Sequence, residues 1–257
     1  MGPREVVIIL AAVAAVAGFL VTIWWIVRRA RRASALVEID ASLAAGEYRR
    51  AESLAIAALE EEKDAEVCLA LRCRLARALV GVEEYTGAAR VCEEAAEVAP
   101  NDAARGEALV ELARCHSAAG ELESASSTLE RTAGAPLQPD ARLRRYLVTA
   151  DVALARLRFD EAERALANGF GAGAAEPLAD EAAIGHARLQ YLRGNFHQAI
   201  AELNRLLQRL HGEDLQALAL ITLARSLLDQ ERPAAVDAEQ SVASALLLAH
   251  YPGLLAI

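Results

Sequence analysis

The chain has 257 residues, of which 54% are hydrophobic and only 4% aromatic, and its formal net charge is −9. Such a composition is typical of a helical protein that packs through small side chains. Residues 1–32 carry a net charge of +4, which leaves −13 for residues 33–257. That acidity excludes nucleic-acid binding through the phosphates as the role of the larger part.

Residues 6–27 form an uncharged hydrophobic run that is long enough to cross the hydrocarbon core of a bilayer. It follows a short flank, residues 1–5, and ends at Trp24 and Trp25, a residue type favoured at the headgroup boundary. A signal peptide cleaved near Ala35 is the alternative, but the run is long and a basic collar (residues 28–34) separates it from that site. The pattern therefore predicts an uncleaved transmembrane helix. The collar contains Arg28, Arg29, Arg31 and Arg32.

The charges that flank this run predict its orientation. Arg4 and the amino group are offset by Glu5 on one side, whereas four arginines follow on the other. By the positive-inside rule, the rest of the chain faces the cytoplasm from a single-pass anchor in a bacterial inner membrane. The reverse orientation, with the larger part outside the cytoplasm, is the alternative. Small residues at Ala14 and Gly18 allow two such helices to pair, so a homo-oligomer is a further possibility.

The remainder of the chain repeats one helix–corner–helix pattern every 37 residues. A hairpin of two helices cannot bury its apolar face alone, but stacked hairpins form a continuous core. Where two helices cross closely only a small side chain fits, so alanine recurs beside a larger residue. The repeat-packing residues are Tyr48, Tyr85, Leu122, Phe159 and Phe196 after each corner, and Ala51, Ala88, Ala125, Ala162 and Ala199 three residues later.

This period predicts an all-α fold, a solenoid of about six helix hairpins over residues 35–250. The helix pairs are expected at 35–46 with 48–62, 66–81 with 83–98, 103–119 with 121–133, 141–156 with 158–168, 179–193 with 195–210, and 215–229 with 234–249. The last copy is degenerate, because Pro233 replaces the large corner residue. An apolar tail, residues 251–257, follows; it either folds back on the last helices or meets a partner.

The repeated residues resemble the tetratricopeptide repeat family, which has an alanine or glycine in helix A, a glycine and an aromatic at the corner, an alanine in helix B and a proline near the end. The matching residues are Leu75, Ala76, Tyr85, Ala88, Ala95 and Pro100 in the second copy; Leu112, Ala113, Gly120, Leu122 and Ala125 in the third; and Ala187, Gly194, Phe196 and Ala199 in the fifth. The resemblance implies a concave surface that binds other proteins or peptides.

In that family the residue after the small helix A position points into the concave groove. The resemblance therefore implies a groove lined by Asp40, Arg77, Arg114, Asp151, Arg188 and Arg225, with Tyr191 beside Arg188. Guanidinium groups are suited to binding carboxylates, so one interpretation is a groove for a segment with acidic and apolar residues. The other is that these arginines pair with carboxylates of adjacent helices and hold the stack together.

Nothing in the sequence predicts an enzyme, a metal site or a cofactor. Cys68, Cys73, Cys92 and Cys115 form no C-x-x-C pair, and their positions fit buried free thiols in a reducing compartment. The sequence contains no P-loop, no dinucleotide fingerprint and no nucleophile elbow.

These patterns together predict a membrane-anchored, cytoplasm-facing scaffold that recruits or organises other proteins. The layout is similar to that of the bacterial lipopolysaccharide assembly protein B family, a single span followed by cytoplasmic repeats, but without the zinc module of that family. The alternatives are a self-assembling structural protein, in which the tail of one copy enters the groove of the next, and an extracytoplasmic chaperone of envelope biogenesis.

Overall fold

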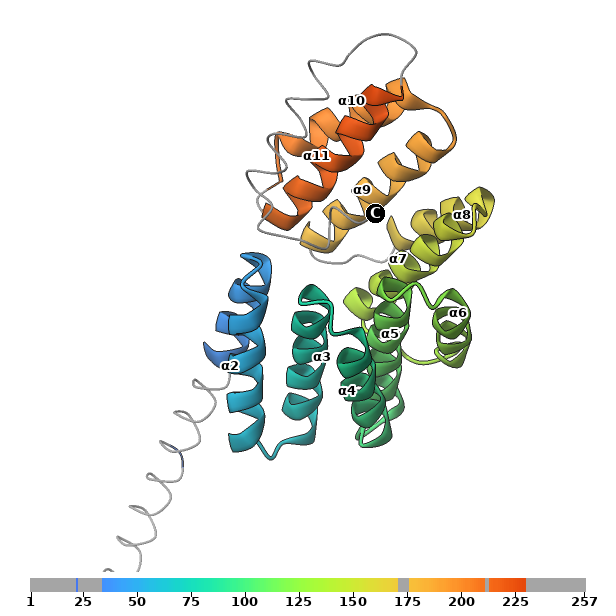
Figure 1. Ribbon diagram of the computed structural model, residues 1–257. Coiled ribbons are helices and arrows are strands. Elements are labelled where there is room, and N and C mark those ends of the chain that lie inside the picture. Colours follow the sequence, from blue (N-terminus) through green and yellow to red (C-terminus); the bar gives the residue numbers. More distant parts are fainter. Residues whose placement is uncertain (1–21, 23–33, 171–175, 211–212, 230–257) are drawn as a thin grey trace, which may run out of the picture.

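In the computed structural model, residue 22 and residues 34–170, 176–210 and 213–229 are described, and within these ranges all regular structure is helical (Figure 1). A helix at residues 34–44 precedes the numbered elements. These are α2 (Tyr48–Glu61), α3 (Ala65–Gly81), α4 (Tyr85–Glu97), α5 (Asp102–Ala118), α6 (Leu122–Arg131), α7 (Pro139–Ala155), α8 (Phe159–Phe170), α9 (Glu176–Leu192), α10 (Phe196–Leu207) and α11 (Glu213–Leu228). The all-α solenoid is confirmed over this part of the chain.

The predicted period is reproduced in the helix boundaries. The odd-numbered helices from α3 onward, which are the A helices, begin 37 residues apart, and so do the even-numbered B helices. Helix B and the junction that follows compensate for each other in length. The junction 132–138 has seven residues after the ten of α6, whereas 62–64 has three after the fourteen of α2. The A helices therefore keep one register along the stack.

Every described corner between helix A and helix B closes in the same way. At the third corner, Gly120 N–H donates to Ser117 C=O and Glu121 N–H donates to His116 C=O. These two bonds satisfy carbonyls at the end of the helix and require a left-handed residue between them. Glycine supplies that conformation at positions 46, 120 and 194, whereas Glu83 (φ 64°) and Leu157 (φ 58°) adopt it with a side chain.

The repeated small residues lie where the period predicts. The helix B alanines at positions 51, 88, 125, 162 and 199 are all fully buried. Each large corner residue is the first residue of its helix B and is half-buried. The ring of Tyr48 lies so close to Gly81 that an added Cβ there would lie 2.3 Å from two ring atoms. Glycine at the end of α3 thus makes room for the aromatic ring of the preceding hairpin.

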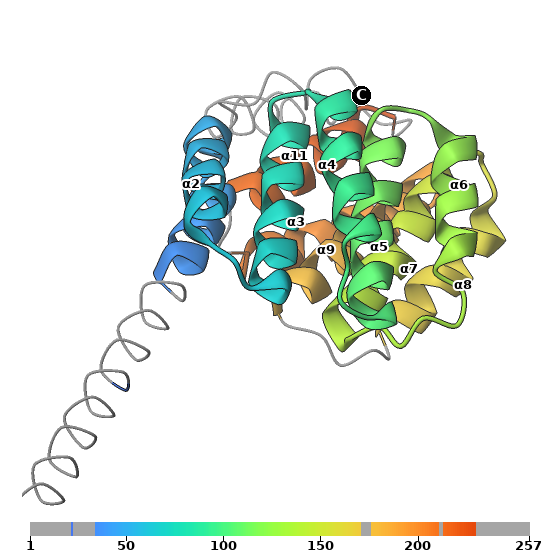
Figure 2. The same cartoon turned by 90° about the horizontal axis from the view of Figure 1, so that it is seen from below.

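The inner surface of the solenoid is formed by the A helices. Each of them, from α3 to α11, packs both on the B helices beside it and on an adjacent A helix. The B helices pack chiefly on the A helices before and after them. Neighbouring A helices lie closer to one another than neighbouring B helices do, so the stack curves with the A helices on its inner side. Figure 2 shows the hairpins following one another along a curved path.

The predicted transmembrane helix, residues 6–27, lies outside the described residues except for Thr22, and so do the collar arginines, Trp24, Trp25 and the tail 251–257. Within the described ranges, no helix combines the length and hydrophobicity needed to cross a membrane.

Candidate functional site

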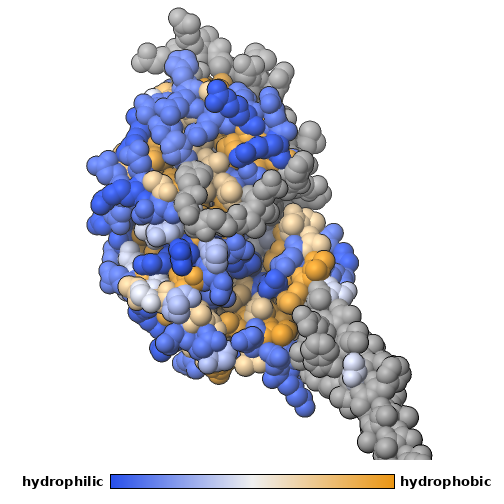
Figure 3. Space-filling model, turned by 180° about the vertical axis from the view of Figure 1, so that it is seen from behind, coloured by the Kyte–Doolittle hydropathy of each residue, from blue (hydrophilic) through white to orange (hydrophobic). Residues whose placement is uncertain are grey.

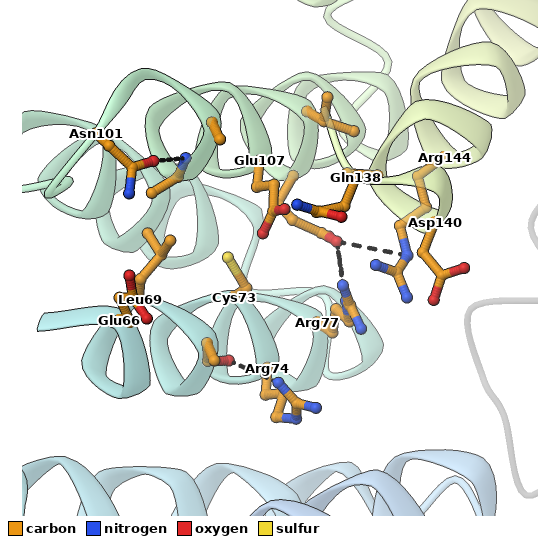
Figure 4. A pocket seen from close by; sticks show the side chains of 16 residues that line it. Glu66, Leu69, Cys73, Arg74, Arg77, Asn101, Glu107, Gln138, Asp140 and Arg144 are labelled. Carbon is orange, nitrogen blue, oxygen red and sulfur yellow. Dashed lines mark hydrogen bonds and ion pairs between the residues drawn. The ribbon is translucent and has the colours of Figure 1, made fainter. Parts of the chain in front are cut away.

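A hollow of about 480 Å³ opens between three consecutive A helices, α3, α5 and α7 (Figure 4). The starts of these helices are fixed by local sequence. The Asp64 side chain accepts from two backbone N–H groups of α3, and Asn101 accepts from Ala104 N–H at 2.8 Å at the start of α5. Pro139 occupies the first turn of α7, where its missing N–H costs nothing. Local sequence thus determines where each of the three helices that form the hollow begins.

One buried carboxylate, that of Glu111 on α5, is the centre of the charged groups here; its side chain is 4% exposed. Arg77 of α3 donates to it from Nη2, and from Nε at 3.1 Å to Oε1. Arg114 of α5 donates from Nε to Oε2 at 3.0 Å. Arg144 of α7 approaches with Nε at 3.8 Å from Oε1. Three successive A helices are thus joined through a single side chain.

The surroundings shift the ionisation of these groups. Burial alone would raise the pKa of Glu111, but the charges of Arg77 and Arg114 outweigh it and hold that pKa well below its usual range. The pKa of Arg77 is raised, because the attraction of Glu111 exceeds the effect of burial. Burial and the neighbouring Arg77 lower the pKa of Arg144. Glu111 is therefore ionised whenever the protein is folded near neutral pH.

Other carboxyl groups of the inner face have the opposite shift. Burial raises the pKa of Glu107, although Arg144 opposes it, and burial likewise raises the pKa of Asp151 and Glu181. In the part of the chain that the structure describes, neither Glu107 nor Glu181 has an ion pair or a side-chain hydrogen bond. In Figure 4 the Glu107 carboxylate lies beside Gln138 at the same end of the hollow as Arg77 and Arg144.

The residues predicted to line the groove fall into three groups. Arg77 and Arg114 meet at Glu111, and Arg77 lines the hollow. Arg188 of α9 pairs with Asp151 of α7 at 3.7 Å, which is a separate contact between A helices. At the far end, the Tyr191 hydroxyl donates to Asp229 at 2.6 Å, and Arg225 of α11 is half-buried.

Asp40, also predicted to line the groove, has a bidentate partner that the sequence analysis did not name. Arg74 of α3 donates from Nε and Nη2 to its two carboxylate oxygens, at 2.8 and 2.7 Å. The pairing of groove arginines with carboxylates of adjacent helices is therefore present at several positions. The side chains of Arg77, Arg114 and Arg188 nevertheless stay 21%, 32% and 36% exposed, so they are also part of the surface.

Glu111, Arg144 and Glu107 were not among the residues predicted to line the groove. A signal existed for two of them, since Glu107, Arg144 and Glu181 are 37 residues apart and share a register on three successive A helices. Glu111 has no such signal, because its register carries Arg74, Val148 and Thr222 in other repeats.

The surface seen from behind is mostly hydrophilic, and hydrophobic residues gather beside a hollowed area (Figure 3). Few large hydrophobic side chains are strongly exposed in the described ranges; Val37 and Leu157 are the most exposed of them. Polar and charged groups thus dominate the faces on which a partner would dock.

Stacked helix hairpins whose A helices form a concave inner face define an α-solenoid, the class of helical-repeat proteins. Residues 82–147 match the family model for the tetratricopeptide repeat. Over these residues the chain thus contains tetratricopeptide repeats, in agreement with the family that its 37-residue pattern resembles. Such repeats generally serve as modules for protein–protein interaction. No curated protein matches the chain.

Proposed function

We propose that this protein is a membrane-anchored scaffold of a bacterial inner membrane, with its repeats facing the cytoplasm. It recruits or organises partner proteins through the concave inner face. The anchor is the hydrophobic run at residues 6–27, and the orientation follows from the collar arginines. The similarity in layout to lipopolysaccharide assembly protein B agrees with this proposal.

The observation that carries the proposal is the inner face itself. It combines tetratricopeptide repeats with a hollow between α3, α5 and α7 that is lined by charged side chains from all three helices. A surface that is concave, polar and built on rigid elements is suited to holding an extended segment of another protein.

Within this face, the end at α9 and α11 is the better site for acidic residues of a partner. Arg188 is 36% exposed and its nearest carboxylate oxygen, from Asp151, is 3.7 Å away, so the existing ion pair is loose. Arg225 has no ion pair within the described residues, and Tyr191 of α9 adds an aromatic ring to this end of the face. Arg77 and Arg114 contribute less, because Glu111 already holds them.

The test is a crosslinked pull-down from membranes with wild type and the double variant Arg188→Gln/Arg225→Gln. The matched control is Arg90→Gln/Arg205→Gln, which removes the same charge from exposed positions on α4 and α10. The groove variant is expected to lose one set of partners that the control retains, at equal thermal stability. An identical list of partners for all three proteins would overturn the groove as the binding site.

The two alternatives have their own tests. A reporter enzyme that is active only in the periplasm, fused to the repeats, is expected to be inactive; activity would favour the extracytoplasmic chaperone. Deleting residues 251–257 is expected to leave oligomeric state and partner capture unchanged. Loss of oligomers on that deletion would favour the self-assembling structural protein.

A further inference from the structure

In the hollow between α3, α5 and α7, the cationic side chains have carboxylate partners within the protein, whereas two of the carboxylates have no cationic partner in the described residues. Each arginine that lines it has an intramolecular carboxylate nearby. Arg74 is held by Asp40, Arg77 by Glu111, and Arg144 lies 3.8 Å from Glu111 and is also attracted by Asp140. The cations of the hollow are therefore largely neutralised by the protein itself.

Two of the lining carboxylates differ. Glu107 is half-buried inside the hollow, and Glu66 is exposed at its edge. Neither side chain has an ion pair or hydrogen bond within the ranges that the structure describes. A partly buried carboxylate without a close partner carries a desolvation cost that a cation of a ligand would offset. Burial raises the pKa of Glu107, as this cost requires.

We infer that the hollow binds a basic side chain, lysine or arginine, of the docked partner segment, and that the side chain pairs with Glu107. The half-buried apolar residues of the hollow, Ala70 and Ala103, offer a small surface for the aliphatic stem of such a side chain. The net charge of −13 on residues 33–257 favours the approach of a basic segment.

This inference rests on the proposed function and adds a direction to it. A segment that lies along the inner face has its basic residue at α5 and its acidic residues near Arg188 and Arg225, which lie two and three hairpins further on. The order of charges along the partner then fixes which end of the groove each end of the segment occupies.

The test titrates the full-length protein in mild detergent with two labelled peptides, acetyl-Leu-Arg-Leu-amide and acetyl-Leu-Glu-Leu-amide. Fluorescence anisotropy measures the affinity for wild type, Glu107→Gln and the control Glu93→Gln, which removes one charge from an exposed position on α4. We expect the arginine peptide to bind more tightly than the glutamate peptide. E107Q should weaken it about tenfold, the effect of one charge-assisted hydrogen bond, and E93Q should leave it unchanged.

A third variant keeps the result interpretable if E107Q folds poorly. Arg144→Gln removes a cation beside Glu107 and is expected to leave the arginine peptide bound at least as tightly as wild type. Equal affinities of E107Q and E93Q for the arginine peptide would overturn the inference. So would a wild-type protein that binds the glutamate peptide more tightly than the arginine peptide and loses this preference in R144Q. If the Arg188/Arg225 variant still loses its partners in the pull-down, the proposed function stands even when this inference fails.

Discussion

Arg77 on α3 donates from both Nε and Nη2 to Glu111, which lies 34 residues later on α5. Arg114 holds the second carboxylate oxygen, and Arg144 of α7 approaches the first. Other A helices also meet through ion pairs, Arg74 with Asp40 and Arg188 with Asp151, but each of these joins only two charges. Among the described residues, the junction at Glu111 is the one where several charges converge on a single buried group. These charged groups hold neighbouring hairpins together and also form part of the inner surface.

Replacing Glu111 with glutamine is expected to lower the free energy of unfolding by about 3 kcal/mol, because it leaves the arginines around it without their shared counter-ion. The urea midpoint at constant m-value measures the effect. The control is Glu94→Gln, whose partner Arg90 is 3.8 Å away with both side chains exposed, and its effect should be about 0.5 kcal/mol or less. Similar losses in the two variants would contradict the role of Glu111.

The same carboxylate predicts an acid sensitivity. Because the arginines depress the pKa of Glu111 in the folded state, its contribution is fully present above its unfolded pKa of about 4.5 and is lost as the pH falls toward the folded value. Unfolding free energies measured between pH 7 and pH 3 should therefore fall more steeply for wild type than for E111Q. Parallel curves would show that Glu111 does not titrate in this way.

Of the corners that the structure describes, the two without glycine are sites where a substitution should stabilise the protein. Leu157 has a φ of 58° and is 66% exposed, so Leu157→Gly removes left-handed strain and little packing. We expect a gain of about 1 kcal/mol. The reciprocal change, Gly120→Ala at a φ of 77°, should cost about the same amount. Calorimetric melting of both variants tests this, and a loss of stability in L157G would refute it.

The contact between Gly81 and Tyr48 predicts an overpacked variant. A Cβ at position 81 would lie 2.3 Å from atoms of the Tyr48 ring, so Gly81→Ala should cost about 2 kcal/mol. The change is expected to be milder in a Tyr48→Ala background, where the ring is absent. A double-mutant cycle from urea unfolding measures this coupling, and strict additivity would mean that the ring moves away freely.

His186 on α9 should make stability depend on pH above 6.5, the ordinary pKa of a histidine. Its Nδ1 lies 3.0 Å from both carboxylate oxygens of Glu202, and that hydrogen bond raises its pKa above 6.5, with Glu163 adding to the shift and burial and Arg193 opposing it. The stabilisation is therefore full below pH 6.5 and is lost as the pH rises through the folded pKa.

The expected difference between wild type and His186→Gln is about 1 kcal/mol larger at pH 6 than at pH 9, measured by urea unfolding. Glu202→Gln should abolish the same pH dependence, because it removes the partner that retains the proton. A pH dependence that survives in E202Q would assign it to another group.

Much of the fold follows from the repeat. The period predicts the positions of the buried alanines, of the large first residue of each B helix and of the corners. It does so because every hairpin packs on its neighbours in the same way. The predicted boundaries of the described helices are correct to within three residues. Only the left-handed residue varies, since Glu83 and Leu157 replace glycine where the hydrogen bonds still require that conformation.

The candidate site is less predictable, for a physical reason. Periodicity reports what all repeats share, whereas Glu111 serves one junction only. The predicted groove residues Arg77 and Arg114 do lie on A helices, but neither sequence spacing nor composition shows that a single carboxylate from α5 binds both. That information depends on the distance between neighbouring A helices, which arises only when the stack is formed.

The constant spacing of the A helices has a consequence for how such a chain can change. Since a longer junction is matched by a shorter B helix, as in α6 and residues 132–138, the outer half of a repeat can be rebuilt without displacing a single inner side chain. The two faces of the array are thus free to diversify separately. The outer face can be reshaped while the inner face keeps its arrangement of side chains.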